Sequence, residues 1–171
     1  MPPHWVLASE RSLPKMEKRE SQTMRWIITF VALVGLGTAS LALPEHYRTG
    51  TSPCKINDVW DCGTVNKSPH SAFHNVPLVG EVPVAAIGIA GYLLLAVLSL
   101  RRLWGALLIC AVGGLAFSLY LTWIEWKVLE TWCIYCVINV CTILLLTLLA
   151  LIEAVLQRPG SHPRTAARNV S

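Results

Sequence analysis

Cysteines are the side chains with the clearest capacity for chemistry in this 171-residue sequence, and two of them form a Cys-x-x-Cys pair, Cys133 and Cys136. The pair stands at the start of a long apolar run. Two cysteines three residues apart share one face of a helix, so their sulfurs can close a small disulfide ring. Free amide groups and the positive end of the helix dipole favour a thiolate there. The pattern predicts thiol–disulfide redox chemistry.

A second pair, Cys54 and Cys62, has seven residues between its members. Three interpretations compete. The pair could form a static structural disulfide, or it could bind zinc together with His70 and His74, although this spacing differs from that of zinc fingers. The third interpretation is a relay, in which two dithiols exchange electrons through a mixed disulfide. The relay accounts best for both pairs and expects no metal, but it needs a terminal electron acceptor, for which a lipid-soluble quinone is suited.

The composition indicates an integral membrane protein. Hydrophobic residues make up 54% of the chain and charged residues 14%, against about 25% charged residues in average soluble domains. The net charge of +4 is not arranged as a basic stripe with interleaved aromatic residues, so nucleic-acid binding is not indicated. Cys110 and Cys141 lie inside apolar runs, where we expect them to be small buried hydrophobic residues.

The apolar runs predict an all-α fold, a four-transmembrane-helix bundle with a polar loop cap between helices 1 and 2. A cleaved signal peptide is the alternative for the first run, but that run is longer than a usual signal core. We expect Pro44 to end the first helix, Pro83 to lie in the first turn of the second, and Thr131 to be the N-cap of the fourth. The predicted spans and loop are 26–43, 82–100, 103–123, 133–156 and the outer loop 44–81.

Positive charges predict the orientation. Ten of the fourteen Lys and Arg residues lie on the terminal segments or in the short turn between the second and third spans, and the other four lie on the opposite side. By the positive-inside rule, the polar segments 1–24 and 157–171 are cytoplasmic, and the first is expected to be disordered or loosely attached. The 44–81 loop and Cys133 then face the extracytoplasmic side, where disulfides persist.

The order of these features resembles the vitamin K epoxide reductase family in its bacterial disulfide-forming branch, over residues 24–156. A second quinone-linked family, the DsbB type, also has four helices and two cysteine pairs but carries Cys-x-x-Cys in its first outer loop, whereas here that motif comes last. The matching residues are Cys54 and Cys62, the segment Val65-Asn66-Lys67-Ser68-Pro69, Val82-Pro83 before Gly88 and Gly91-Tyr92, and Trp132-Cys133-Ile134-Tyr135-Cys136.

The resemblance implies a direction of electron flow. Cys54 takes electrons from the reduced thiols of a soluble, thioredoxin-like partner on the extracytoplasmic side, and Cys62 passes them to Cys133. Cys136 meets the quinone, which is ubiquinone, menaquinone or a vitamin K-like molecule. The net product is a disulfide in a secreted protein, made at the bacterial inner membrane. Cys133 is expected to lie nearer the water and Cys136 one turn deeper.

Ser68 matches a family position proposed to form a hydrogen bond near the quinone; capping a turn before Pro69 is the other interpretation. His70 and His74 are expected to be surface residues of the outer loop. Glu125 and Glu130, in the link before the fourth span, are expected to decorate the membrane surface.

Two departures from the animal enzymes favour quinone reduction over vitamin K epoxide reduction. Those enzymes have a tyrosine four residues after the second Cys-x-x-Cys cysteine, where this chain has Val140, and no clear match to their active-site asparagine occurs in the second helix. An epoxide reductase remains the first alternative function. The second is a non-catalytic membrane scaffold whose outer loop is held by a Cys54–Cys62 disulfide.

Overall fold

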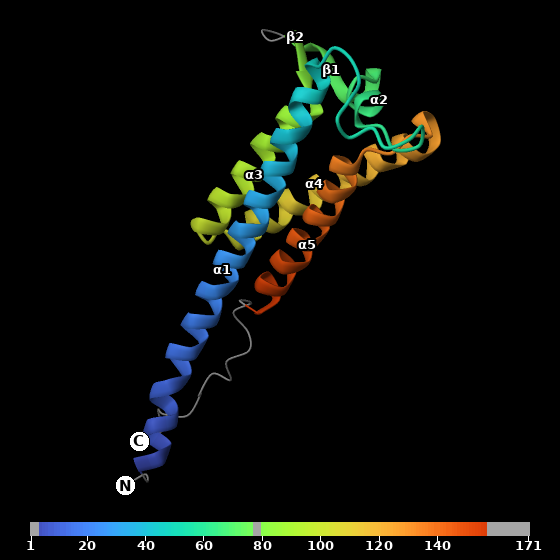
Figure 1. The fold of residues 1–171 in the computed structure, drawn as a ribbon. Helices are drawn as coiled ribbons and strands as arrows, with labels where there is room; N and C mark the ends of the chain where they lie inside the picture. Colours follow the sequence, from blue (N-terminus) through green and yellow to red (C-terminus); the bar gives the residue numbers. More distant parts are fainter. Residues whose placement is uncertain (1–3, 77–79, 157–171) are drawn as a thin grey trace.

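The chain folds into a bundle of long helices with a small irregular region at one end (Figure 1). The computed structural model describes residues 4–76 and 80–156, with side chains from residue 22 onward except 74–79; the predicted tail 157–171 lies outside the described residues. Three helices contain apolar stretches long enough to cross a membrane, and α3 is a shorter apolar helix of 17 residues. The long helices are α1 (His4–Tyr47), α3 (Val84–Leu100), α4 (Trp104–Ile124) and α5 (Ile134–Leu156).

The core of the bundle is shared equally among these helices. Each contributes three buried residues to one cluster, which explains why the helices pack together and do not stand apart. The cluster consists of Ile28, Ala32 and Ala39 from α1, Tyr92, Leu95 and Ala96 from α3, Trp104, Leu107 and Ala111 from α4, and Ile143, Leu146 and Ala150 from α5. Small residues let α1 and α3 approach closely: a Cβ added at Gly88 would lie 3.5 Å from the Cβ of Ala39, in ordinary van der Waals contact.

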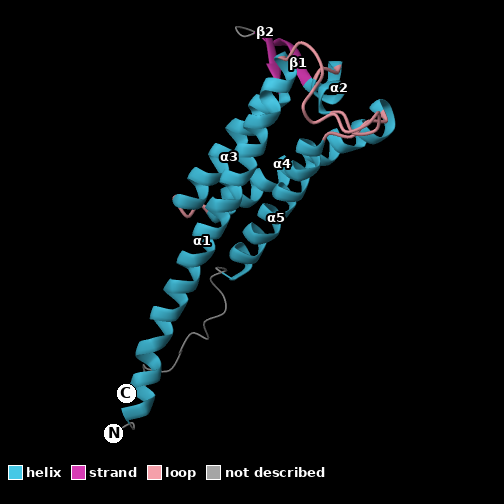
Figure 2. Ribbon diagram, in the orientation of Figure 1, coloured by secondary structure: helices cyan, strands magenta, loops and turns pink. Residues whose placement is uncertain are grey.

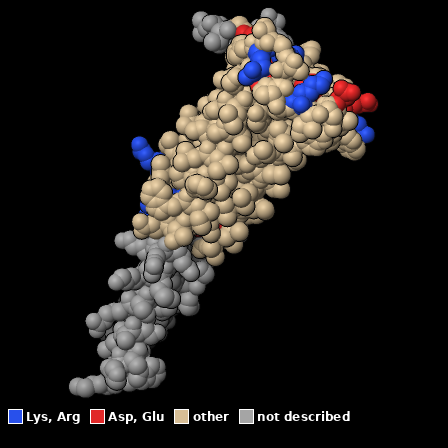
Figure 3. All heavy atoms as spheres, viewed as in Figure 1, with Lys and Arg blue, Asp and Glu red and all other residues tan. Residues whose placement is uncertain are grey.

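The outward faces of the helices are apolar as well. Phe30, Ile109 and Leu151 are 67%, 74% and 47% exposed, and the face in Figure 3 has a broad uncharged middle with Lys, Arg, Asp and Glu near its two ends. So large an exposed apolar surface is unfavourable in water and is the surface expected against lipid. The chain is a membrane protein.

The first helix is longer than predicted at both ends. The backbone is helical from His4, so the expectation of a disordered or loosely attached segment before residue 25 is wrong for residues 4–25. The segment is rich in Glu, Lys, Arg, Gln and Met, which are good helix formers, and it extends an existing helix. Pro44 does not end α1, which continues to Tyr47. This added turn carries Glu45 and His46 to the residues that follow the helix.

The other helices begin one or two residues later than predicted, at Val84, Trp104 and Ile134. Pro83 is the N-cap of α3 and the last residue of a short strand, not a residue of the first turn. The α3–α4 turn contains Arg102 in the left-handed region (φ 57°). This turn, the N-terminal end of α1 and the C-terminal end of α5 lie away from the irregular region (Figure 1), the relative arrangement that the charge pattern predicts.

The irregular region is the α1–α3 connection, residues 48–83. Its elements are α2 (Cys62–Asn66), the short 3₁₀ turn η1 (Pro69–Ser71), and the antiparallel pair β1 (Ala72–Val76) and β2 (Gly80–Pro83). Figure 2 shows loops linking these elements above the ends of the long helices. Polar contacts attach the connection to the last turn of α1: Ser52 donates to the Glu45 carboxylate (2.6 Å), and His46 Nδ1 donates to the Asn66 carbonyl oxygen (2.6 Å).

Candidate functional site

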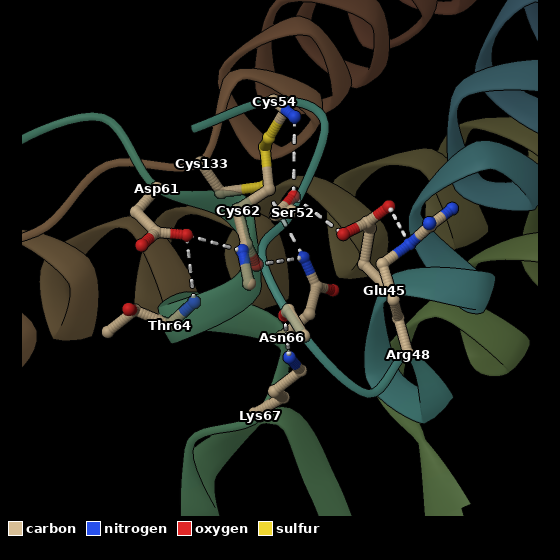
Figure 4. Close-up of polar contacts among 12 residues, drawn as sticks. Glu45, Arg48, Ser52, Cys54, Asp61, Cys62, Thr64, Asn66, Lys67 and Cys133 are labelled. Carbon is tan, nitrogen blue, oxygen red and sulfur yellow. Dashed lines mark hydrogen bonds and ion pairs between the residues drawn. A yellow bond between two sulfur atoms is a disulfide. The ribbon is translucent and has the colours of Figure 1, made fainter. Parts of the chain in front are cut away.

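Four cysteines from distant parts of the sequence lie in one cluster at the junction of the α1–α3 connection and the start of α5. Cys62 and Cys133 are both fully buried there, and Cys54 and Cys136 pack against them as partly buried residues. Cys54 and Cys62 form a disulfide with a Cα–Cα distance of 5.8 Å, while Cys133 and Cys136 are free thiols. Figure 4 shows Cys133 beside the Cys54–Cys62 disulfide.

A short backbone pairing sets this arrangement. The connection and the residue before Cys133 form a parallel bridge between Trp60 and Trp132. Trp132 N–H donates to the Val59 carbonyl (2.7 Å), and Asp61 N–H donates to the Trp132 carbonyl (3.1 Å). Because the two segments are fixed at these residues, the cysteines that immediately follow them, Cys62 and Cys133, are held side by side.

Asp61 then starts the helix that carries Cys62. Its side chain accepts hydrogen bonds from the backbone N–H groups of Gly63 (2.9 Å) and Thr64 (3.2 Å), as an N-cap does. Lys55 Nζ lies 3.3 Å from its other oxygen. Burial acts to raise the pKa of Asp61, but the hydrogen bonds from Thr64, Lys55 and Gly63 together lower it. The carboxylate is therefore held in its charged, capping form.

Asn66, at the end of α2, connects the two cysteine pairs. Its buried side-chain amide donates to the Cys62 carbonyl (2.9 Å) and lies 3.5 Å from the Cys133 sulfur (Figure 4). An amide donor favours the thiolate form of a sulfur over its thiol form. Asn66 thus offers Cys133 a fixed donor during thiol exchange. The sequence motif contained Asn66, but no pattern in the sequence indicated its contact with Cys133.

The start of α5 differs from the prediction. Thr131 is not its N-cap, because the helix begins at Ile134 and the Thr131 hydroxyl donates instead to the Leu129 carbonyl (3.1 Å). The Cys133 carbonyl accepts the first backbone hydrogen bond, from Val137. The expectation that Cys133 lies nearer the water is wrong too, because the connection covers it completely while Cys136 stays partly exposed.

The pKa of Cys133 is lowered, chiefly because the Cys136 thiol donates a hydrogen bond to its sulfur. Burial and the negative charge of Glu125 oppose this effect, and backbone N–H groups at the start of α5 add to it. Of the two thiols, Cys133 is therefore the one whose sulfur more readily carries a negative charge, which suits it to leave as a thiolate in exchange with Cys62.

Glu125 belongs to this site, contrary to the expectation that it lies on the surface. Its side chain is only 2% exposed, its Oε2 accepts the backbone N–H of Cys133 (3.2 Å), and it is hydrogen-bonded to the Cys136 side chain. It opens η2 (Glu125–Leu129), a π-helical turn that continues α4 and ends at Glu130 in the left-handed region (φ 51°). Glu130 is exposed, as expected. A carboxyl group at the end of an apolar run is itself a signal of function.

A largely apolar cavity of about 390 Å³ opens beside Cys136. It is lined from α1, α3, α4 and α5 and from the connection, and Cys136 and Glu125 both line it. Gly91 and Gly113 line it as well, and a Cβ at either glycine would meet nothing within 4 Å. These two glycines therefore leave room for the cavity and do not bring helices together. The size is within the range of small-molecule sites, roughly 300–1,000 Å³.

Ser68 and His70 also line this cavity. The Ser68 hydroxyl donates to the Val65 carbonyl (2.8 Å) and does not cap the 3₁₀ turn. The turn is closed from the other side, where the Ser71 hydroxyl and N–H donate to the Ser68 carbonyl. His74 lies in β1, and its side chain is outside the described residues.

A polar chain crosses the cavity wall between three helices. The Tyr92 hydroxyl of α3 donates to Asn139 Oδ1 of α5 (2.8 Å), and the Asn139 amide donates to Ser118 of α4 (3.3 Å). All three residues line the cavity. The sequence suggested neither a tyrosine nor an asparagine partner here, because the two residues approach only once α3 and α5 pack. Val140, next to Asn139, is not among the cavity residues.

The remaining cysteines stand apart from the cluster. Cys110 is half-buried against the bundle core, close to what was expected, and it also lines the cavity. Cys141 is exposed on α5, so its predicted burial is wrong. As for zinc, Cys54 and Cys62 are bonded to each other, and no group of three potential metal ligands gathers among the residues that the structure describes.

Two comparisons with known proteins bear on this site. The comparison with curated proteins gave no match. Residues 26–151, well over half of the chain, match the model of the vitamin K epoxide reductase family. The match includes both cysteine pairs, the connection between them and all of the cavity. The chain therefore belongs to the vitamin K epoxide reductase family and is a membrane oxidoreductase of the thiol–disulfide type.

Proposed function

We propose that this chain passes electrons from the thiols of a partner protein to a membrane quinone and thereby drives disulfide formation in the partner. A reduced, thioredoxin-like protein reduces the Cys54–Cys62 disulfide. Cys62 then attacks the Cys133–Cys136 disulfide at Cys133, and the mixed disulfide resolves when Cys54 attacks Cys62. The Cys133–Cys136 dithiol is reoxidised by the quinone. Two electrons and two protons leave the partner and end on the quinone, so the cycle balances.

The observation that carries this proposal is the burial of Cys62 beside Cys133 in one cluster that also includes Cys54 and Cys136. A disulfide whose only role is to staple a loop has no reason to lie against a second, free dithiol. Direct thiol exchange needs a nucleophilic sulfur next to a disulfide sulfur, which this cluster supplies. Partly exposed Cys54 is the member of its pair that a partner protein can reach.

The cavity supports a quinone as acceptor. Enzymes of this family use quinones and generally work with thioredoxin-like partners. A quinone accepts two electrons and two protons and has a flat apolar ring with carbonyl oxygens, which suits an apolar cavity with few polar groups. We propose Cys136 as the residue that meets the ring and the second N–H of the Asn139 amide as a donor to one of its oxygens. Ser68 can donate to a quinone oxygen only by releasing the Val65 carbonyl. Ubiquinone, menaquinone and a vitamin K-like molecule all fit this description.

We further propose that α1, α3, α4 and α5 all span the membrane, with the connection as a cap on the extracytoplasmic side. At about 1.5 Å per residue, the 17 residues of α3 are slightly short for a bilayer core of about 30 Å. The strand β2 extends α3 at the end where the cap lies. Both termini and the Arg101–Arg102 turn are then cytoplasmic, as the charge distribution predicts. Formation of disulfides on the outer side corresponds to the bacterial branch of the family, at the inner membrane.

The test is quinone reduction by the purified protein in detergent, with a reduced thioredoxin-like protein as donor. Wild type is compared with Cys136→Ala and with Cys141→Ala, a matched control whose exposed thiol lies outside the cluster. We expect turnover in wild type and in the control, and loss of turnover in Cys136→Ala. Wild-type turnover of vitamin K epoxide but of no quinone would favour the epoxide alternative. Equal turnover in all three proteins would contradict a relay through Cys136. Folded wild type that is inactive on both substrates would contradict the relay and leave the scaffold.

A further inference from the structure

Glu125 is a buried ionisable group to which the relay described above gives no role. It is 2% exposed and lies at the end of an apolar helix, and no ion pair involves it among the described residues. Burying a carboxyl group is costly unless its environment makes use of it. Its contacts are with the two parts of the reaction: the Cys133 backbone and the Cys136 thiol on one side, and the cavity on the other.

Reoxidation of the dithiol must move two protons as well as two electrons. Cys136 leaves its thiol form when Cys133 and Cys136 join, and a quinone that takes up an electron pair must also take up protons. Among the described residues that line the cavity, Glu125 is the one with a carboxyl group. On the basis of the proposed function, we infer that Glu125 is the acid–base group of the quinone-reducing step: it takes the Cys136 proton and gives it to a quinone oxygen in the cavity.

The step balances as follows. The Glu125 carboxylate accepts the proton of Cys136, the Cys133–Cys136 sulfur–sulfur bond forms, and the electron pair released goes to the quinone. The Glu125 carboxylic acid then donates its proton to one quinone oxygen, while the proton of Cys133 supplies the other. Glu125 is a carboxylate before and after the step. The dithiol becomes a disulfide and the quinone becomes its hydroquinone.

Other titratable groups line the cavity, namely His70, Tyr92, Cys110 and Tyr135. Within the part of the chain that the structure describes, no hydrogen bond joins any of them to the Cys136 sulfur, and the Tyr92 hydroxyl is committed to Asn139. Glu125 is therefore the group that combines contact with the reacting thiol and access to the cavity. This contact makes it a catalytic residue and not a distant support.

The decisive variant is Glu125→Gln. Glutamine has the same shape and can still accept the Cys133 N–H through its side-chain oxygen, so a purely structural role survives the change. It cannot carry a proton. Glu130→Gln is the matched control, since Glu130 is an exposed glutamate five residues further on, directly after the π-helical turn. Glu125→Asp keeps an ionisable carboxyl group and should retain more activity than Glu125→Gln.

The kinetic measurement uses pre-reduced protein mixed with quinone in the absence of any donor, so that only the second half of the relay is observed. We expect Glu125→Gln to slow quinone reduction about 10²–10³-fold at neutral pH, the usual range for loss of an acid–base group. The rate of the variant should rise about tenfold per pH unit, because hydroxide must now remove the thiol proton. Disulfide exchange with the protein donor should change by no more than about twofold.

A readout independent of turnover is the infrared S–H stretching band of the reduced protein, assigned to Cys136 by its loss in Cys136→Ser. In wild type the one proton of this thiol is shared between two acceptors, the Cys133 sulfur and the Glu125 carboxylate. A carboxylate is a stronger acceptor than an amide, so the band should shift to higher frequency in Glu125→Gln and stay unchanged in Glu130→Gln. Wild-type rates and an unshifted band in Glu125→Gln would overturn the role of Glu125 alone. Inactive wild type would instead remove the proposed function, and the role of Glu125 with it.

Discussion

The two cysteine pairs lie in parts of the molecule that are held together by different forces. The α1–α3 connection, which carries Cys54 and Cys62, is held by side-chain hydrogen bonds: Asp61 caps α2, and Glu45 and His46 attach the segment to α1. The bundle, at whose mouth Cys133 and Cys136 lie, is held by close apolar packing of four helices. Polar contacts in water contribute modestly and can be exchanged for contacts with water, whereas tight helix packing has few alternatives.

This difference suits a relay. The connection must bring one dithiol to a partner protein and also to Cys133, so a segment attached by individually weak contacts can adjust without unfolding the protein. The dithiol that reduces the quinone must instead stay fixed beside the cavity. The predictions below test whether the two regions separate in function and in stability.

The largest effect on the rate of quinone reduction should come from removing one cysteine pair at a time. Each double variant is measured with two electron donors, a protein and a small dithiol. We expect Cys133→Ala/Cys136→Ala to lower quinone reduction by roughly a thousandfold or more with any donor, because the nucleophile next to the cavity is lost. Cys54→Ala/Cys62→Ala should show the same loss with a thioredoxin-like protein but a smaller one, about tenfold, with a small dithiol that can reach partly exposed Cys136. Rates with the two donors measure this difference. Equal loss in both variants with the small dithiol would mean that the pairs do not act in series.

The next effect concerns helix packing in the bundle. A Cβ placed on Gly35 of α1 would overlap the ring of Tyr92, which is buried and hydrogen-bonded to Asn139. We expect Gly35→Ala to lower the free energy of unfolding by about 1–3 kcal/mol, the usual cost of overpacking. Gly37→Ala, two residues along on an exposed position where a Cβ meets nothing within 4 Å, should not destabilise the protein. Thermal unfolding in detergent compares them; equal transition temperatures would contradict the packing argument.

The sequence predicted most of this bundle because its signals are local. Apolar runs of nearly 20 residues predict helices wherever they occur. Two predicted spans separate the 44–81 loop from Cys133, so the chain returns to the end of the bundle that it left. The family resemblance, carried by short motifs around Cys62 and Cys133, proved correct. Arg101 and Arg102 likewise marked a turn that the structure contains.

The errors fall where contacts between distant residues decide the outcome. Thr131 has the right side chain for an N-cap, but the Trp60–Trp132 bridge keeps its segment extended and delays the helix to Ile134. Pro44 has the right chemistry to end a helix, yet contacts of Glu45 and His46 with the connection extend α1 past it. Glu125 was expected on the surface because it lies in a short polar link. The π-helical turn directs its carboxylate inward, and the residue types of the link do not reveal that turn. Neither pairing nor turn geometry can be read from residue types alone.

A smaller, electrostatic effect should separate the two thiols of the bundle. The hydrogen bond from the Cys136 thiol is the main cause of the lowered pKa of Cys133. Cys136→Ala removes this donor and should raise the pKa of Cys133, so that each unit of increase leaves about tenfold less thiolate at a pH below it. Cys136→Ser keeps a hydroxyl donor and should lie between wild type and Cys136→Ala.

The pH midpoint of Cys133 alkylation, followed by mass spectrometry, measures this pKa in the three proteins. Midpoints are compared, not absolute rates, because Cys133 is buried and access is equally restricted in each. An unchanged midpoint in Cys136→Ala would mean that Asn66 or the helix start, and not Cys136, supports the Cys133 thiolate.

The smallest effect belongs to the connection. Asp61→Ala should lower the local stability of α2 by about 1 kcal/mol at neutral pH, the usual cost of losing an N-cap. Because the pKa of Asp61 is lowered in the folded chain, its contribution is present above the unfolded pKa and is lost as the pH falls through the folded value. The rates of amide hydrogen exchange in α2 should therefore become equal for wild type and Asp61→Ala in acid.

Asp58→Ala is the control, since that exposed side chain is 3.8 Å from Lys55 and caps no helix. The contrary outcome is that Asp61→Ala lowers the free energy of unfolding of the bundle as much as that of α2. The connection and the bundle would then unfold as one unit, and the two cysteine pairs would not lie in regions of independent stability.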